Sequence, residues 1–241
     1  MASTDGQRIL EHLAVVAAER RQRAQDTALA ARVQAVKLWQ HQRFAATYAD
    51  LLATPRYAKA ARFFLDDLYG PHDFSERDDQ FVRIVPALVR LFPEEIVQTV
   101  QALAELHAVS EELDTQMGLA CNNTELDAQT YGEAWRAVAR PGDRERQIRL
   151  MLDVGAALDR FTRNPLLRHS LKLMRGPARA AGLGALQAFL ENGFDTFREM
   201  RGAREFLDTV AARERALAAA LFAAQPVPNA TSGTPGSGQV P

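Results

Sequence analysis

The chain has 241 residues and carries 29 Lys and Arg against 30 Asp and Glu, which gives a formal net charge of -1. This balance provides no overall field toward nucleic acid or an anionic membrane. A single cysteine, Cys121, excludes an intrachain disulfide. No uncharged apolar run approaches the roughly 20 residues that span a bilayer, and the run from Leu13 to Ala18 is too short for a signal peptide, so we expect a cytoplasmic protein without a membrane span.

The amino-acid usage predicts an all-α fold. Ala, Leu, Arg, Glu and Gln dominate, while Val and Ile never alternate over the length of a strand. We expect a compact multi-helix bundle that forms a single domain over residues 1–225. Residues 226–241 are almost all Pro, Gly, Ser, Thr and Asn, with little to bury, and predict a disordered C-terminal tail.

The first predicted element is a long N-terminal helical region over about 5–53. Residues 19–26 are polar on every face, so this stretch must be exposed to solvent or broken. Gln40 interrupts an apolar stripe that follows at near-helical spacing, formed by Leu29, Val33, Val36, Phe44 and Leu51.

Prolines and glycines mark the next helices. Pro55 predicts the first residue of a second helix, which ends at Gly70-Pro71. A third helix begins with a capping pair, Asp73 with Glu76 or Ser75 with Asp78, and contains Pro86.

Pro93 opens a fourth helix over about 96–117, and Trp135 lies on the helix that follows it. The remaining helices are expected over about 126–138, 143–163, 166–174, 183–197 and 206–221. Gly202 separates the last two, and Gly182, Gly184 and Gly193 suggest close contacts between helices or a ligand beside the backbone.

The densest motif surrounds the turn at Gly70. Residues 63–70 read Phe-Phe-Leu-Asp-Asp-Leu-Tyr-Gly, with arginines and carboxylates on both sides. This segment resembles the signature of the bacterial FFLEELY motif proteins, with Asp66 and Asp67 where that name has two glutamates. The resemblance is strongest over 56–92 and implies no activity, because the family is defined by its motif.

The mixture of aromatic and charged residues in this motif favours a non-catalytic binding protein. We expect a protein partner or a small ligand to bind where the segment 63–81 meets the helix that carries His107. The residues expected at this surface are Phe63, Phe64, Asp66, Asp67, Tyr69, Arg77, Asp78 and His107.

A metal site is the alternative hypothesis. His107 and Glu111 are four residues apart on one predicted helix face, and such side chains bind transition metals. With Asp66 and Asp67 they would form the centre of a haem-oxygenase-like or di-iron-like oxidoreductase. The chain has no Glu-x-x-His motif of the ferritin-like type, however, and no particular cofactor is indicated.

Basic residues cluster at 20–23 and again at Arg140, Arg144, Arg146 and Arg149. The first cluster lacks interleaved aromatics and lies among acids, so it is interpreted as a solvated helix face, and nucleic-acid binding is not favoured. A homo-oligomer that covers the polar middle of the first helical region is a further hypothesis.

Overall fold

Helices form the secondary structure of the protein. The computed structural model describes residues 4–68, 70–72 and 74–225, and no strand occurs among them, which confirms the all-α prediction. The predicted tail at 226–241 lies outside the described residues, as do Tyr69 and Asp73. In chain order the elements are α1 (Thr4–Gln25), α2 (Thr27–Thr47), α3 (Ala49–Ala53), α4 (Ala58–Arg62), the π-helix η1 (Phe63–Leu68), α5 (Ser75–Leu91), α6 (Glu94–Ala120), α7 (Ala128–Val138), α8 (Pro141–Thr162), α9 (Pro165–Leu173), α10 (Arg175–Ala180), α11 (Gly184–Met200) and α12 (Arg204–Phe222).

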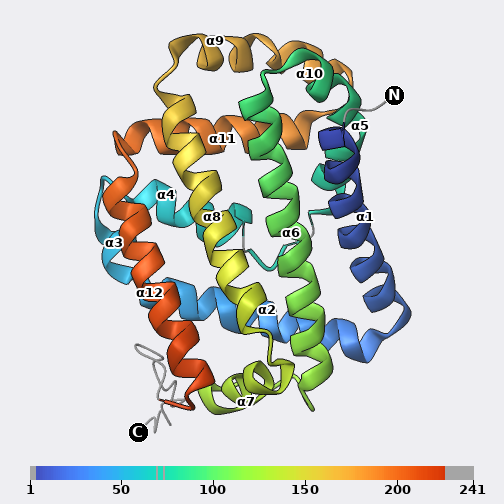
Figure 1. The fold of residues 1–241 in the computed structure, drawn as a ribbon, viewed down its shortest axis with the longest axis vertical. Coiled ribbons are helices and arrows are strands. Elements are labelled where there is room, and N and C mark those ends of the chain that lie inside the picture. The colour runs from blue at the N-terminus through green and yellow to red at the C-terminus, as the bar shows by residue number, and fades with distance from the viewer. Residues whose placement is uncertain (1–3, 69, 73, 226–241) are drawn as a thin grey trace, which may run out of the picture.

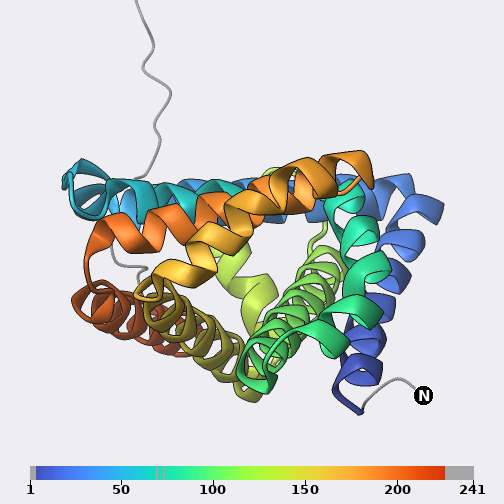
Figure 2. The same cartoon turned by 90° about the horizontal axis from the view of Figure 1, so that it is seen from above.

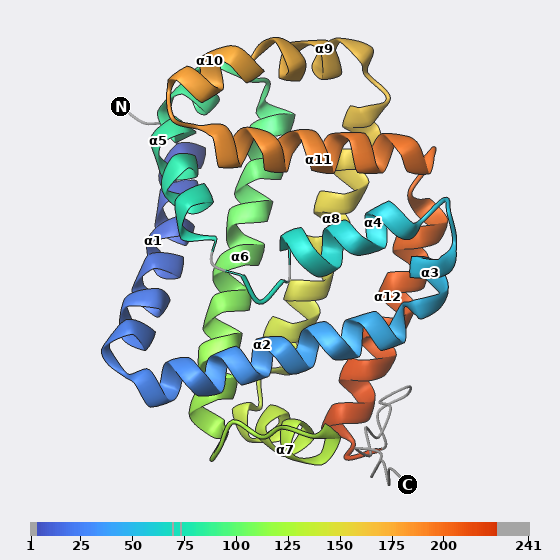
Figure 3. The ribbon, with the colours of Figure 1, turned by 180° about the vertical axis from the view of Figure 1, so that it is seen from behind.

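These helices are arranged in two crossed layers. The long helices α1, α6, α8 and α12 run side by side in one layer (Figure 1). The helices α2, α4 and α11 cross them on the other side (Figure 3), and the end view in Figure 2 separates the two layers. The short helices α7 and α9 lie at opposite ends of the molecule. This arrangement confirms the expected compact multi-helix bundle.

An aromatic core fills the space between the layers. Phe64 packs against Phe206 and Phe197, with ring centroids 5.5 and 6.2 Å apart, and all three rings are buried. Burial of each such side chain contributes roughly 1.5–3 kcal/mol. The contacts of Phe64 with Phe197 and Phe206 therefore hold η1 against α11 and α12.

The long N-terminal region is broken at Asp26. This residue has an extended backbone (φ -133°, ψ 97°), and its carboxylate accepts a hydrogen bond of 2.9 Å from the Leu29 backbone N–H. Such a cap stabilises the start of α2. The break allows α1 to pack along α6 while α2 turns to cross it, at a point where Gly118 faces Val33.

The predicted start of the second helix is wrong. Pro55 lies in a turn closed by the bond from the Tyr57 N–H to the Thr54 carbonyl, and α4 begins only at Ala58. Of the two residues expected to cap the third helix, Ser75 is instead the first residue of α5, with Phe74 at the cap position, and Asp73 lies outside the described residues. Pro86 does lie inside α5, as expected.

Candidate functional site

The aromatic pair of the motif serves the core. The side chains of Phe63 and Phe64 are buried, and their rings meet edge to face at 6.4 Å. Phe63 also stacks on Phe189, with centroids 5.5 Å apart. Neither ring is therefore available to a partner at the surface.

The two aspartates of the motif point to different surroundings. Asp66 is half exposed and lies 3.3 Å from His41 Nε2. Asp67 accepts a hydrogen bond of 2.9 Å from the Asn192 side chain, and burial raises the pKa of its carboxyl. Tyr69 lies outside the described residues.

Arg77, Asp78 and His107 are brought together, as the sequence predicted. Asp78 Oδ2 lies 2.7 Å from His107 Nε2 and 2.7 Å from Arg20 Nη2. Burial alone would raise the pKa of Asp78, but the hydrogen bond to His107 and the positive charges of Arg77 and Arg20 lower it. The carboxylate of Asp78 is thus the centre of a buried ionic cluster.

This cluster continues along α6 to Glu111 and Asp114. Glu111 forms ion pairs with Arg23 and with Lys37, whose Nζ lies 2.8 Å from Glu111 Oε1. Lys37 Nζ also lies 3.6 Å from Asp114 Oδ2. The interpretation of 20–23 as a solvated face is wrong for Arg20 and Arg23, because α1 packs against α5 and α6, where Arg20 pairs with Asp78 of α5 and Arg23 pairs with Glu111 of α6.

The structure does not bring the four residues of the alternative metal site together. Asp66 is paired with His41, whereas Glu111 is held by Arg23 and Lys37 on another element. Within the described ranges, no group of three or more His, Cys, Asp or Glu side chains has the arrangement needed to hold a metal ion.

A cavity of about 80 Å³ does lie beneath the predicted binding surface. Its polar lining consists of Arg77, Asp78, His107 and Ser110, and its remaining walls are apolar side chains from α1, α5, α6 and α11 and Leu68. The polar groups are bonded mainly to other protein groups: Asp78 to His107, and Ser110 to Gln147. None of the described polar side chains of this cavity has a buried polar atom without a hydrogen-bond partner.

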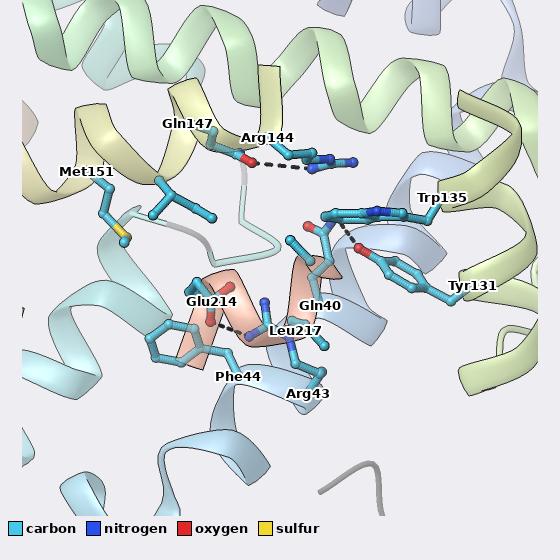
Figure 4. A pocket seen from close by; sticks show the side chains of 12 residues that line it. Gln40, Arg43, Phe44, Tyr131, Trp135, Arg144, Gln147, Met151, Glu214 and Leu217 are labelled. Carbon is cyan, nitrogen blue, oxygen red and sulfur yellow. Dashed lines mark hydrogen bonds and ion pairs between the residues drawn. The ribbon is translucent and has the colours of Figure 1, made fainter. Parts of the chain in front are cut away.

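A second cavity, of about 70 Å³, lies where α2, α7, α8 and α12 converge (Figure 4). Gln40, Arg43, Tyr131, Trp135 and Arg144 form one part of its wall, with Gln147 and Glu214. The apolar part consists of Phe44, Ile148, Met151, Leu217 and Ala218.

Unpaired hydrogen-bond donors distinguish this second cavity. Four buried side-chain polar atoms have no hydrogen-bond partner among the described residues, and three of them belong to its lining: Arg43 Nε, Trp135 Nε1 and Arg144 Nη2. Leaving one such donor unsatisfied costs about 1–3 kcal/mol. Three unpaired N–H groups around one cavity therefore favour a bound ligand that accepts hydrogen bonds.

The charges of the cavity do not balance within the protein. Arg43 Nη1 is paired with Glu214 at 2.6 Å, and Tyr48 donates to the same carboxylate at 2.8 Å. Arg144 has only a long bond of 3.3 Å to the Gln147 side chain and stacks over the Trp135 ring at 3.9 Å. Arg144 is 5% exposed and forms no ion pair within the described part of the chain, and burial lowers the pKa of its guanidinium.

Tyr131 and Gln40 connect this cavity to the ionic cluster. The Gln40 amide donates to Asp114 Oδ1 at 3.1 Å and to the Tyr131 hydroxyl at 3.2 Å. Burial raises the pKa of Tyr131, so its hydroxyl keeps its proton and offers a further donor. The signal in the sequence was Gln40 itself, a polar residue within an apolar stripe, together with Arg144 in the second basic cluster.

The fold and this site define an all-helical protein with a buried ionic cluster and a cationic cavity. Residues 19–228 match the family described as a domain of unknown function, DUF8198, and the chain belongs to this family. Neither the curated proteins nor the solved structures include a significant match. No helix among the described residues is both long enough and apolar enough to cross a membrane.

Proposed function

We propose that this protein binds a small organic carboxylate in the cavity between α2, α7, α8 and α12. The observation that carries the proposal is Arg144, a buried cation without an anionic partner, beside two further donors without acceptors. A carboxylate would accept hydrogen bonds from Arg144 and from the Trp135 indole N–H, and its charge would balance the guanidinium.

The size of the cavity limits the ligand to a few heavy atoms. Its volume of about 70 Å³ compares with roughly 30 Å³ for one water molecule in the liquid. A nucleotide does not fit this volume, whereas a short-chain acid does. Phe44, Met151 and Leu217 would then contact the alkyl part of the ligand.

Isothermal titration calorimetry with propionate tests the proposal, and propionamide is the neutral ligand of the same shape. We expect propionate to bind and propionamide not to bind. Arg144→Met should weaken propionate binding at least about tenfold, because a hydrogen bond to a charged group contributes roughly 1.5–3 kcal/mol. Trp135→Phe, which keeps an aromatic ring but loses the N–H, should weaken it by a smaller factor.

The matched control is Arg149→Met, since Arg149 lies exposed on the same helix, α8. It should bind propionate as the unchanged protein does. Arg144→Met should keep its melting temperature or raise it, because loss of an uncompensated buried cation is neutral or stabilising. Equal binding of propionate and propionamide would contradict the proposal, as would an equal loss of propionate affinity in Arg144→Met and Arg149→Met. If inorganic phosphate bound more tightly than propionate, the ligand would be an inorganic oxyanion and not a carboxylate.

A further inference from the structure

One part of the chain departs from the overall charge balance. Residues 160–190 include six Arg and Lys and no Asp or Glu, in a protein with a net charge of -1. This segment covers the end of α8, all of α9 and α10, and the beginning of α11. It places a concentration of positive charge at one end of the molecule, where α9 forms the edge (Figure 1).

The helix α9 exposes apolar side chains at the same place. None of its residues is buried. Leu166 is 73% exposed and Leu173 is 64% exposed, and their spacing of seven residues puts them on one face. Met174 follows directly and is 51% exposed. Single exposed apolar residues are ordinary, but two on one short helix and a third directly after it form an apolar ridge.

A basic cleft of about 330 Å³ adjoins this ridge. Its lining includes Arg163, Arg168, His169, Lys172 and Arg198. Two acids neutralise part of this charge: Asp159 pairs with Arg163, and Asp195 lies near Arg168 and Arg198. Lys172 and His169 take part in no ion pair with the described residues, so the cleft keeps an excess of positive charge.

We infer that the α9 end of the molecule binds the surface of an anionic phospholipid membrane. The apolar ridge of Leu166, Leu173 and Met174 enters the headgroup layer, and the basic cleft receives lipid phosphate. Basic residues alone would serve nucleic acid equally well, but nucleic acid offers no partner for the exposed leucines. A bilayer satisfies both features at once, and it can reach α9 because this helix lies at the edge.

Vesicle sedimentation with the full chain tests this inference. The protein should pellet with vesicles of phosphatidylcholine and phosphatidylglycerol at 7:3 and stay in solution with phosphatidylcholine alone. Salt at 0.5 M should release it, because ions screen the attraction. Charge reversal by Lys172→Glu in the cleft together with Arg179→Glu at an exposed position of α10 should lower the partition coefficient at least about tenfold. Leu166→Ser with Leu173→Ser should do the same.

Two controls carry the same chemical changes at the other end of the molecule. Arg21→Glu lies on an exposed position of α1, and Leu119→Ser changes a side chain of α6 that is 50% exposed. Both should leave the partition unchanged, and circular dichroism should give the same melting curve for every variant. Failure to pellet with the anionic vesicles, or an equal loss in the controls, would overturn the inference. If charge reversal lowered the partition and the leucine variant did not, the α9 end would be a phosphate-binding site and not a membrane-binding surface.

Discussion

Glu111 pairs with three cations of the buried ionic cluster: Arg20, Arg23 and Lys37. Burial alone would raise the pKa of its carboxyl, but the charges of Lys37 and Arg23 lower it to about 2 from an ordinary value of 4.5. A pKa lowered by folding stabilises the folded state above the unfolded pKa, and this contribution is lost as the pH falls from 4.5 toward about 2. The shift corresponds to about 3 kcal/mol. Burial raises the pKa of Asp114, which offsets part of this dependence.

We expect Glu111→Gln to lower the free energy of unfolding by about 3–5 kcal/mol at pH 7, because the buried Arg23 would lose its anionic partner and Lys37 would lose the nearer of its two carboxylates. Urea denaturation at pH 7 and pH 3 measures this. At pH 3 the difference in the free energy of unfolding between Glu111→Gln and the unchanged protein should be smaller than at pH 7 by roughly half or more. Glu125→Gln, at an exposed position, should have no effect at either pH. A difference that is constant with pH would show that the charge of Glu111 is not the cause.

At the scale of helices, Gly118 sets the distance between α2 and α6. A Cβ atom at this position would meet a methyl group of Val33 and would lie 3.2 Å from the Val33 backbone nitrogen. Backbone cannot move aside as a flexible side chain can, so the two helices would have to separate.

Gly118→Ala should therefore destabilise the protein by about 1–3 kcal/mol, although alanine favours a helix more than glycine does. Chemical denaturation measures the change. Gly184→Ala is the control, because a Cβ there has no atom within 4 Å, and it should be neutral or slightly stabilising. If Gly118→Ala and Gly184→Ala changed the stability equally, the close contact between α2 and α6 at Gly118 could not be the cause.

Sequence periodicity predicted most helices because each one depends on its own pattern of apolar residues. It failed in part at residues 55–68, where a turn, the short helix α4 and the π-helix η1 replace the expected continuous α-helix. Proline at position 55 was compatible both with the first residue of a helix and with a turn. Of the glycines singled out, Gly193 does lie close to the Phe63 ring, since a Cβ atom at this position would be 3.0 Å from it, whereas Gly182 provides a positive φ of 68° in a turn.

The candidate site could be predicted only in part, because its contacts are distant in the sequence. Asp78 and His107 were expected at one surface because of the mixture of aromatic and charged residues there, and they lie 2.7 Å apart. Arg43 and Glu214 are separated by 171 residues, and no local pattern connects them. A helical pattern gives the face on which an arginine lies, but the partner of that arginine depends on how the layers cross.

For the whole molecule, the proposed ligand should stabilise one end more than the other. The helix α7 contributes Tyr131 and Trp135 to the cavity, whereas α9 lies at the opposite end. Hydrogen exchange measured by mass spectrometry should slow in α7 when propionate is saturating, because local opening would release the ligand. Exchange in α9 should not change. Uniform slowing in both helices would indicate a general salt effect instead of binding at the cavity.

The walls of the cavity come in part from the second and the last of the helices that the structure describes. Gln40 and Arg43 come from α2, and Glu214 and Leu217 come from α12. The pocket therefore cannot close until α2, α12 and all the helices between them have been synthesised. Its ligand can stabilise the folded protein, but it cannot guide the early steps of folding.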